Sequence, residues 1–496
     1  MKLKQEKQYQ ISELIDCSQQ NEPSLELSDK ILQIVRQSRR AFEQLKDNQS
    51  RIYGTSTGFG PFVENDAAPD TGQQASNLIN HLGVGTGEYF RPSITRCAMV
   101  LRAISLSRGY SAIRPEPYID YLALIESGEI PAVPKTGSVG ASGDLVPMAN
   151  VVLAMRGDGF FLKVTDASNV FNRIEASPLE LTSRDALAIV NGVPFCCALA
   201  IHTHFYLNKL LTIAERLTAW LYASLGCSQQ AVSKTLNRVK GHPEQKTAAQ
   251  NIREALEQKT INAGVNRPLQ EFYSIRGAPQ ILGAVRKQLD QARTTITEEI
   301  NGVDDNPIVE AGEENNQVFH GANFMAQNLA FCTDSLNEAA TQLGNLIERQ
   351  LNLLLDPDHN NQLPKMLAVN PGQDSGFAGA QINATAIVSE MRNDCQSYGA
   401  SSLSTNGQNQ DIVPMALESG KNAFGQTDRL GKLLGILGIG LTQYDWLFES
   451  QKDVTLDNKP DWFPEVDPLD GDRPLVNDIS SVSKQLTSLS SKSLKT

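Results

Sequence analysis

The segment GSVGASGDLVPMAN, residues 137–150, decides how the rest of the chain is interpreted. It consists largely of glycine and other small residues, contains no histidine, and has one carboxylate, Asp144. Such a segment is typical of a phosphate-binding loop, a turn with a nucleophilic serine, a tightly packed turn, or a stretch that modifies its own backbone. The first two have motifs that can be compared with the sequence.

Neither of these two motifs fits. The phosphate-binding loop GxxxxGK[ST] needs a lysine after its second glycine, and neither Gly137 nor Gly140 has one at that offset. The serine motif GxSxG needs glycine at position 144, which is Asp144. A dinucleotide-binding GxGxxG is also absent, since HLGVGTGE (81–88) gives only GxGxG. A turn whose small residues simply allow close packing stays open.

One other chemistry needs these residue types in this order. If the backbone nitrogen of Gly143 attacks the carbonyl carbon of Ala141, a five-membered ring closes and water is lost. Loss of the Ser142 hydroxyl as a second water leaves an exocyclic methylidene. This electrophile would perform chemistry that ordinary side chains cannot.

Outside this segment, helical periodicity dominates. Residues 1–178 mix short helical patterns with glycine-rich loops and carry the central segment. Residues 179–477 have apolar residues at three- and four-residue spacing over long stretches, as in 329–355, which predicts a bundle of long helices. Residues 478–496 have little apolar content and are predicted to be a disordered tail. The fold class is therefore mainly α, with active-site loops in the N-terminal region.

Composition limits the possible partners. The chain has 496 residues and a net charge of −12, without a cluster of lysine and arginine, so we expect no nucleic-acid partner. The seven cysteines are scattered without zinc-site spacing, which indicates reduced thiols in a cytoplasmic protein. His202 and His204 would point in different directions on a helix, and we expect no metal.

Apolar stretches do not predict a membrane protein. The start of the chain, MKLKQEKQYQ, is charged and lacks the apolar core of a signal peptide. The run LLGILGIGL (433–441) is too short to span a bilayer, and the run 195–225 contains charged residues such as Lys209. We expect both runs to be buried helices.

Seven motifs resemble, in family order, the aromatic amino acid ammonia-lyases and aminomutases, which include the histidine, phenylalanine and tyrosine ammonia-lyases. They are YGTSTGFGP, GSVGASGDLVPMAN, LAIVNG, YSIRGAPQILG, INGVDDNPIV, GANF and NGQNQDIVPM. This family carries a 4-methylidene-imidazol-5-one (MIO) group in an ASGD sequence. The resemblance implies a fumarase/aspartase-like bundle and an MIO formed autocatalytically from Ala141, Ser142 and Gly143 without a metal. It also implies a homotetramer with sites shared between subunits.

The resemblance implies catalytic roles for other residues. Tyr53 takes the place of the tyrosine base, and its surroundings would have to lower its pKa, for example with the help of a helix N-terminus or an arginine. Arg276 takes the place of the arginine that binds the substrate carboxylate, and Tyr273, one helical turn earlier, can face the same cavity. By residue type alone, Tyr53 could be a half-buried aromatic beside a glycine turn, and Arg276 could form a surface salt bridge.

Further positions follow from the same resemblance. Asn191 matches the asparagine that supports the MIO carbonyl and the substrate. Asp144 helps to position the backbone for cyclisation, although an aspartate there could equally cap the following helix. The implied substrate-binding positions are Gly60, His81, Leu82, Gln270, Asn323, Phe324, Asn409 and Gln410. Of these, Phe324 matches a phenylalanine packed near the ring, but a phenylalanine on a helix is usually part of the core.

Four positions depart from the family pattern. Thr55 and Ser56 replace the usual residues in the middle of YGVNTGFG, which bears on the hydrogen bonds of that loop. Gly277 stands where cysteine or threonine is frequent, and Pro414 stands where serine is usual. The sequence gives no interpretation of Pro414.

Two positions bear on the substrate. His81-Leu82 falls where tyrosine-active members have His-Leu, phenylalanine-active members Phe-Leu and histidine-active members Ser-His. An imidazole can bond a phenolic hydroxyl, whereas His81 could also be a histidine bonded to the backbone. Gln410 stands where histidine-active members have glutamate, and its neutral amide does not complement a histidine substrate. Both positions argue against a histidine ammonia-lyase.

Three hypotheses remain. The first is a carbon–nitrogen lyase that eliminates ammonia from L-tyrosine alone, or from both L-tyrosine and L-phenylalanine, to give 4-coumarate or cinnamate. The second is a tyrosine 2,3-aminomutase that returns the amine to the β-carbon; the closure of the lid loops decides between the two, and the sequence does not report it. The third is a non-catalytic helical scaffold. An MIO-bearing chain would weigh two water molecules less than its sequence.

Overall fold

The structure is a computed structural model that describes residues 1–48, 51–162, 179–262, 267–312, 315–452 and 454–490. These residues are mainly helical, as the sequence predicts. They form two compact units. The first comprises Met1–His202, Arg293–Asp334 and Ser397–Lys421, and the second comprises Thr203–Ala292, Ser335–Gln396 and Asn422–Thr496. The division thus differs from a single boundary between residues 178 and 179, because two later segments pack with the N-terminal region.

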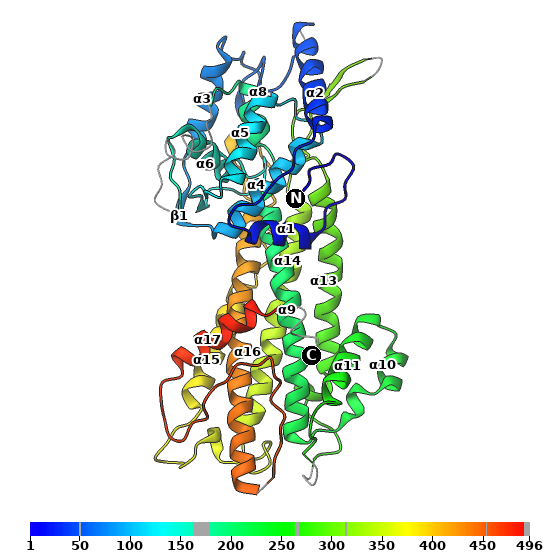
Figure 1. Ribbon diagram of the computed structural model, residues 1–496, viewed down its shortest axis with the longest axis vertical. Coiled ribbons are helices and arrows are strands. Elements are labelled where there is room, and N and C mark those ends of the chain that lie inside the picture. Colours follow the sequence, from blue (N-terminus) through cyan, green and yellow to red (C-terminus); the bar gives the residue numbers. More distant parts are fainter. Residues whose placement is uncertain (49–50, 163–178, 263–266, 313–314, 453, 491–496) are drawn as a thin grey trace. The chain divides into compact units, whose positions relative to one another are not determined.

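The first unit contains short helices and two small antiparallel sheets of two strands each. Their bounds are α1 (Ile11–Gln19), α2 (Asp29–Asp47), η1 (Gly60–Phe62), α3 (Thr71–Leu82), β1 (Thr86–Tyr89), α4 (Pro92–Ser107), α5 (Pro115–Glu126), β2 (Pro134–Thr136), α6 (Leu145–Arg156), α8 (Ser183–Val190), β3 (Ile308–Glu310), β4 (Gln317–Phe319) and η4 (Asn406–Gln408). Helices α3, α6 and α8 pack against one another (Figure 1), and α4 packs against α1, α2 and α5. Thr86 of β1 lies opposite Thr136 of β2, and Val309 of β3 opposite Val318 of β4.

Four long helices each have residues in both units. They are α9 (Pro194–Leu225), α13 (Ala278–Asn301), α14 (Gln327–Leu355) and α16 (Ala416–Lys452). The predicted helix over 329–355 is confirmed as part of α14, and the apolar run 433–441 is a fully buried part of α16. The periodicity identified these helices because long amphipathic or buried segments leave the clearest pattern.

The apolar run that begins before residue 195 is also buried. Among the described residues, the stretch Ser183–Leu225 is long and apolar enough to cross a membrane by length and composition alone. The window that meets this test is entirely buried within the protein, as in the core helix of a folded domain. This burial agrees with the predicted buried helix.

Two short connections in the first unit lead to the residues of interest. The 137–144 loop joins β2 to α6, and the 191–193 turn joins α8 to α9. Helix α8 begins with a capping box, in which the side chains of Thr182 and Asp185 each accept a bond from the other residue's backbone. Helix α6 ends at Gly157, whose φ of 87° favours glycine. Local signals therefore fix where both helices begin or end.

The second unit contains the remaining shorter helices. Their bounds are η2 (Gln229–Val232), α10 (Lys234–Lys240), α11 (Pro243–Leu256), α12 (Tyr273–Arg276), η3 (Lys365–Leu367), α15 (Ala378–Asn393) and α17 (Val476–Ser488). Helix α15 lies within residues 179–477, for which the sequence predicts long helices. Helix α12 is a single turn and carries two of the predicted site residues.

Helix α17 occupies most of the segment predicted to be disordered. Val482 and Leu486, four residues apart, are buried. They pack where α16 offers glycine, since a Cβ at Gly435 would lie 3.5 Å from the Val482 side chain. The prediction of disorder from residue 478 is therefore wrong for the described part, because Val482 and Leu486 are buried in the second unit. Residues 491–496, like 163–178, lie outside the described residues.

Candidate active site

The 137–144 loop and the 191–193 turn lie in direct contact. Gly143 has φ of 77°, and a Cβ there would lie 2.1 Å from the carbonyl oxygen of Gly192. The backbone N–H of Asp144 donates to that same oxygen at 2.5 Å. Both the conformation and the available space therefore require glycine at position 143.

Ser142 is held at two of its atoms. The side-chain amide of Asn191 donates through Nδ2 to the Ser142 carbonyl oxygen at 3.1 Å. Gln410 donates through Nε2 to Ser142 Oγ at 2.5 Å, and the hydroxyl of Thr405 donates to Gln410 Oε1. Asn191 thus contacts the carbonyl that the sequence analysis assigned to it, and Gln410 lies beside the serine side chain.

Ala141 lies on the apolar side of the same loop. It is 4% exposed and packs in a cluster with Val413 and Met415. Gly140, one residue earlier, accepts a hydrogen bond from the backbone of Ala326 at 3.1 Å. The residues that flank Pro414 thus form the apolar backing of Ala141, but nothing in the structure explains the choice of proline at that position.

The Asp144 carboxylate binds the start of α9 instead of capping α6. Asp144 occupies the N-cap position of α6, yet its side chain makes no capping bond there. Instead it accepts from the Cys196 backbone N–H at 2.8 Å, from Cys196 Sγ at 3.1 Å and from Ser138 Oγ at 3.0 Å. Burial raises the Asp144 pKa to about 6, against the lowering effect of these donors. The capping alternative is wrong, because the N-terminus of α9 supplies the donors.

Tyr53 lies in the loop before η1 with its hydroxyl engaged. The backbone N–H of Gly60 donates to Tyr53 Oη at 2.8 Å, and the backbone N–H of Tyr53 donates to His320 Nε2 at 3.2 Å. Burial raises the pKa of Tyr53 above its ordinary value, while the Gly60 N–H partly lowers it. The expectation of a lowered pKa is not met, because the effect of burial outweighs that of the Gly60 N–H. His320 has no role in the sequence analysis.

His81 lies on the last turn of α3 and is exposed, while Leu82 beside it is buried. The imidazole Nδ1 lies 3.1 Å from the carbonyl oxygen of Asn77, one turn earlier. A carbonyl can only accept, so Nδ1 carries the proton, and in the neutral imidazole Nε2 is then an acceptor. The backbone-bonded alternative for His81 is therefore observed, and it uses only one of the two ring nitrogens.

The remaining predicted positions of the first unit are more exposed. Asn323 is exposed, and Phe324 is half-buried in the turn before α14, so it is neither a helix residue nor part of the core. Asn409 is exposed at the end of η4, and its backbone N–H donates to Asn406 at 3.1 Å. No contact that the structure describes brings these three residues to Ser142.

Three predicted site residues belong to the second unit. Tyr273 and Arg276 lie on α12, with the Arg276 guanidinium 4.6 Å from the centre of the Tyr273 ring. Tyr273 is 74% exposed, and Gln270 is exposed before it. Arg276 makes no ion pair among the described residues, and its buried Nε has no hydrogen-bond partner there. The surface salt-bridge alternative for Arg276 is therefore not observed in the described part of the chain.

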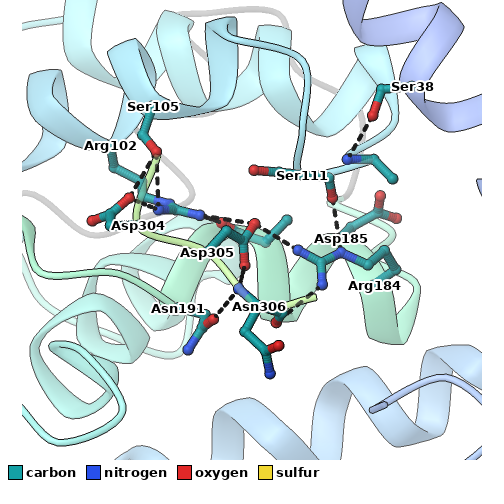
Figure 2. Close-up of polar contacts among 12 residues, drawn as sticks. Ser38, Arg102, Ser105, Ser111, Arg184, Asp185, Asn191, Asp304, Asp305 and Asn306 are labelled. Atoms are coloured by element: carbon teal, nitrogen blue, oxygen red, sulfur yellow. Dashed lines mark hydrogen bonds and ion pairs between the residues drawn. The ribbon is translucent and has the colours of Figure 1, made fainter. Parts of the chain in front are cut away.

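A buried network behind the 191–193 turn was not assigned by the sequence analysis. Figure 2 shows Arg102 and Arg184 converging on Asp305, with Asp304 and Asn306 beside it. Arg102 pairs with Asp304 at 2.7 Å and with Asp305 at 3.2 Å, and Arg184 pairs with Asp305 at 2.6 Å. The INGVDDNPIV motif contains both aspartates and could have pointed to this network. Aspartates lie mostly on the surface, however, so the motif alone did not predict a buried pair.

Known proteins resemble this chain in both sequence and fold. The model of the family described as "Aromatic amino acid lyase" matches residues 9–450. A tyrosine ammonia-lyase of Cupriavidus metallidurans is 37% identical over 421 residues, 80% of this chain and 78% of that protein. A tyrosine 2,3-aminomutase of Myxococcus sp. is 33% identical over 426 residues, 81% of each. The crystal structure of a tyrosine aminomutase from Streptomyces globisporus superimposes with a TM-score of 0.89 and 28% identity, over 97% of this chain and 95% of that one.

The fold and the loop chemistry thus define a carbon–nitrogen lyase with a helical fumarase/aspartase-like fold. The chain belongs to the aromatic amino acid lyase family. Proteins of this family in general depend on an MIO group and act on small aromatic amino acids. Among the residues that the structure describes, no group of three or more histidine, cysteine or carboxylate side chains is arranged to hold a metal ion.

Proposed function

We propose that Ala141, Ser142 and Gly143 form an MIO group and that the protein eliminates ammonia from L-tyrosine to give 4-coumarate. The observation that carries this proposal is the position of Ser142, held by Asn191 at its carbonyl and by Gln410 at its hydroxyl. A turn that only allowed close packing would need neither contact.

The loop fits the proposed group. Cyclisation joins the Gly143 nitrogen to the Ala141 carbonyl carbon, and glycine leaves the crowded side next to Gly192 clear. The Ala141 carbonyl oxygen leaves as water with the N–H hydrogens of Gly143 and Ser142, and the Ser142 hydroxyl leaves with the Ser142 Cα proton as a second water. The group supplies an electrophilic carbon that makes the substrate amine a better leaving group.

The protein residues handle the proton and the carboxylate. The phenolate of Tyr53 removes the β-proton, and the Gly60 N–H stabilises the negative oxygen as it forms. Arg276 binds the substrate carboxylate, a role supported by its buried Nε without a partner and by the Tyr273 ring that orients the guanidinium.

The substrate preference rests on His81 and Gln410. With its proton on Nδ1, His81 can accept the phenolic hydroxyl of tyrosine at Nε2, and phenylalanine would leave that nitrogen without a partner. Gln410 is neutral, and its amide is engaged by Thr405 and Ser142, so it offers no charge to an imidazole substrate. The relatives named tyrosine ammonia-lyase support the same preference.

A tyrosine 2,3-aminomutase is the second candidate. It is favoured by the Myxococcus relative and by the Streptomyces globisporus structure, both of which carry that name. The two activities would use the same residues and differ in whether ammonia leaves before it returns to the β-carbon. Product analysis separates them.

We also propose a homotetramer in the cytoplasm. Tyr273 and Gln270 are largely exposed in the single chain, which supports a site completed by a neighbouring subunit. The seven cysteines are free thiols, which suits a reducing compartment.

The test is incubation of the purified protein with L-tyrosine, L-phenylalanine or L-histidine, with the products resolved by chromatography. We expect 4-coumarate from tyrosine, little cinnamate from phenylalanine and no urocanate from histidine. β-Tyrosine as the main product would move the assignment to the aminomutase. The Ser142→Ala variant is the control, and it should be folded, retain the full mass of its sequence and give no product.

A further inference from the structure

We infer that Asp304 and Asp305 are positioning residues that hold the 191–193 turn against the 137–144 loop while the ring forms. This inference rests on the proposed function, because it concerns the maturation of the same loop. Neither aspartate contacts Ser142 in the structure. Each acts through a neighbouring backbone group of the turn or of its own segment.

Asp304 holds the turn at its far end. Its Oδ2 accepts the backbone N–H of Val193 at 2.7 Å. Its Oδ1 accepts from Arg102 Nη1 and from Ser105 Oγ, each at 2.7 Å. Gly192, the residue before Val193, presents the carbonyl that accepts the Asp144 N–H. Asp304 therefore holds the Gly192–Val193 peptide group, whose carbonyl oxygen binds the Asp144 N–H directly after the Ala-Ser-Gly sequence.

Asp305 holds the other end of the turn through Asn306. The backbone N–H of Asn306 donates to Asp305 Oδ1 at 2.7 Å and to Asn191 Oδ1 at 2.8 Å. Figure 2 shows this N–H directed toward the Asn191 side chain, with Asp305 between the guanidinium groups of Arg102 and Arg184. The Asp305 carboxylate thus orients the Asn306 N–H that donates to Asn191.

This donor sets the orientation of the Asn191 amide. Because Oδ1 must face the Asn306 N–H, the other end of the amide, Nδ2, faces the Ser142 carbonyl and donates to it. The opposite orientation would place N–H against N–H and oxygen against oxygen. A donor at the Ser142 carbonyl favours the enol-like charge that develops on that oxygen when the adjacent Cα proton leaves.

The network is balanced in charge and buried. Two guanidinium groups face two carboxylates, and Arg102, Arg184 and Asp305 have essentially no exposed side-chain surface. Removal of one charge from such a cluster leaves an uncompensated partner and shifts the groups that depend on it. A displacement of about 1 Å in reacting groups can slow a reaction by about 10²-fold.

The experiment measures maturation directly. The full chain is made by cell-free translation, synthesis is stopped, and the fraction of chains that have lost two water molecules is followed by intact mass spectrometry. We expect Asp305→Asn to lengthen the half-time of this loss by about tenfold to a hundredfold. Asn191→Ala should show a similar delay, and the double variant should be no slower than Asn191→Ala alone.

A matched control separates positioning from general destabilisation. Glu215 is buried in the second unit and pairs with Arg286 at 2.6 Å, so Glu215→Gln also breaks a buried ion pair. We expect it to lower the melting temperature and to mature at the wild-type rate. If Asp305→Asn also matured at the wild-type rate, or if its delay simply added to that of Asn191→Ala, the positioning role would be refuted.

Other outcomes are equally informative. A wild-type chain that kept its full mass would overturn the proposed MIO chemistry and the inference together, whereas normal maturation of Asp305→Asn would overturn the inference alone. Should Asp305→Asn fail to fold, Ser105→Ala removes one donor to Asp304 and keeps every charge. It should still delay maturation measurably, and a wild-type rate for this folded variant would refute the Asp304 arm.

Discussion

At the scale of single residues, specific hydrogen bonds hold the polar groups of the candidate site. Asn191 and Gln410 hold Ser142, and Gly60 holds the Tyr53 hydroxyl. The motifs predicted the identity of these residues but not the protonation of Tyr53, since a pKa depends on burial and on neighbours that the sequence does not place.

The raised pKa of Tyr53 predicts an alkaline activity profile. Only the phenolate removes a proton, and below the pKa its fraction falls about tenfold per pH unit. We therefore expect kcat/KM for tyrosine to rise with pH between about 7 and 9 at a slope near one on logarithmic axes. Steady-state kinetics across this range measures the slope. Tyr53→Phe should lose most activity yet retain the mass of the matured chain, and a flat wild-type profile would exclude Tyr53 as the titrating base.

His81→Phe should change the ratio of the two aromatic substrates. Removal of the Nε2 acceptor leaves the phenolic hydroxyl of tyrosine without a partner, which costs about 1–3 kcal/mol when the group is buried. We expect the tyrosine-to-phenylalanine ratio of kcat/KM to fall by about tenfold or more. Competition between both substrates in one reaction measures this ratio. An unchanged ratio would remove His81 from substrate selection, and Asn77→Ala is the control, because it keeps the backbone carbonyl that orients the ring.

At the scale of elements, regular periodicity predicted the long helices, and interactions between distant segments decided the rest. Helix α14 follows from its apolar stripe, whereas α17 was missed because its two buried residues are few and Val482 packs against Gly435 of α16, which is distant in the sequence. The Asp304 and Asp305 pair was missed for the same reason. Their partners Arg102 and Arg184 lie about 120 to 200 residues away in the sequence, and no local pattern links them.

The packing of α17 within the second unit can be tested by shortening one buried side chain. Leu486 is fully buried and its neighbour Thr487 accepts a bond from Lys209 Nζ at 2.7 Å through its carbonyl. Leu486→Ala should lower the free energy of unfolding by about 2–5 kcal/mol. Denaturant unfolding followed by circular dichroism measures the change. Ser488→Ala is the surface control and should leave stability within about 0.5 kcal/mol. Equal stability of both variants would mean that α17 does not pack as described.

At the scale of the whole molecule, the proposed residues divide between the two units. Ser142, Asn191, Gln410 and Tyr53 belong to the first unit, and Tyr273 and Arg276 belong to the second. The family resemblance predicted both sets from their motifs. Short motifs carry no signal for the oligomeric state, so the proposed tetramer needs a test of its own.

Mixing of two inactive variants tests whether sites are shared. Ser142→Ala lacks the proposed electrophile, and Arg276→Ala lacks the carboxylate partner. If residues of different subunits complete one site, mixed tetramers contain some sites with both groups intact. We expect co-expression of the two variants to restore a measurable fraction of the wild-type rate, while each variant alone stays inactive. Light scattering should give the mass of four chains, and an inactive mixture with that mass would confine each site to one subunit.

The separation of the Ser142 contacts along the chain has a consequence for protein synthesis. Asn191 follows Ser142 by 49 residues and Gln410 by 268 residues. A nascent chain that ends before Gln410, or a misfolded product, cannot make both contacts, so its loop would form the electrophile far more slowly. Under the proposed chemistry, loss of the two waters records that a given molecule has folded, and the mass of the chain becomes a permanent label of its folding history.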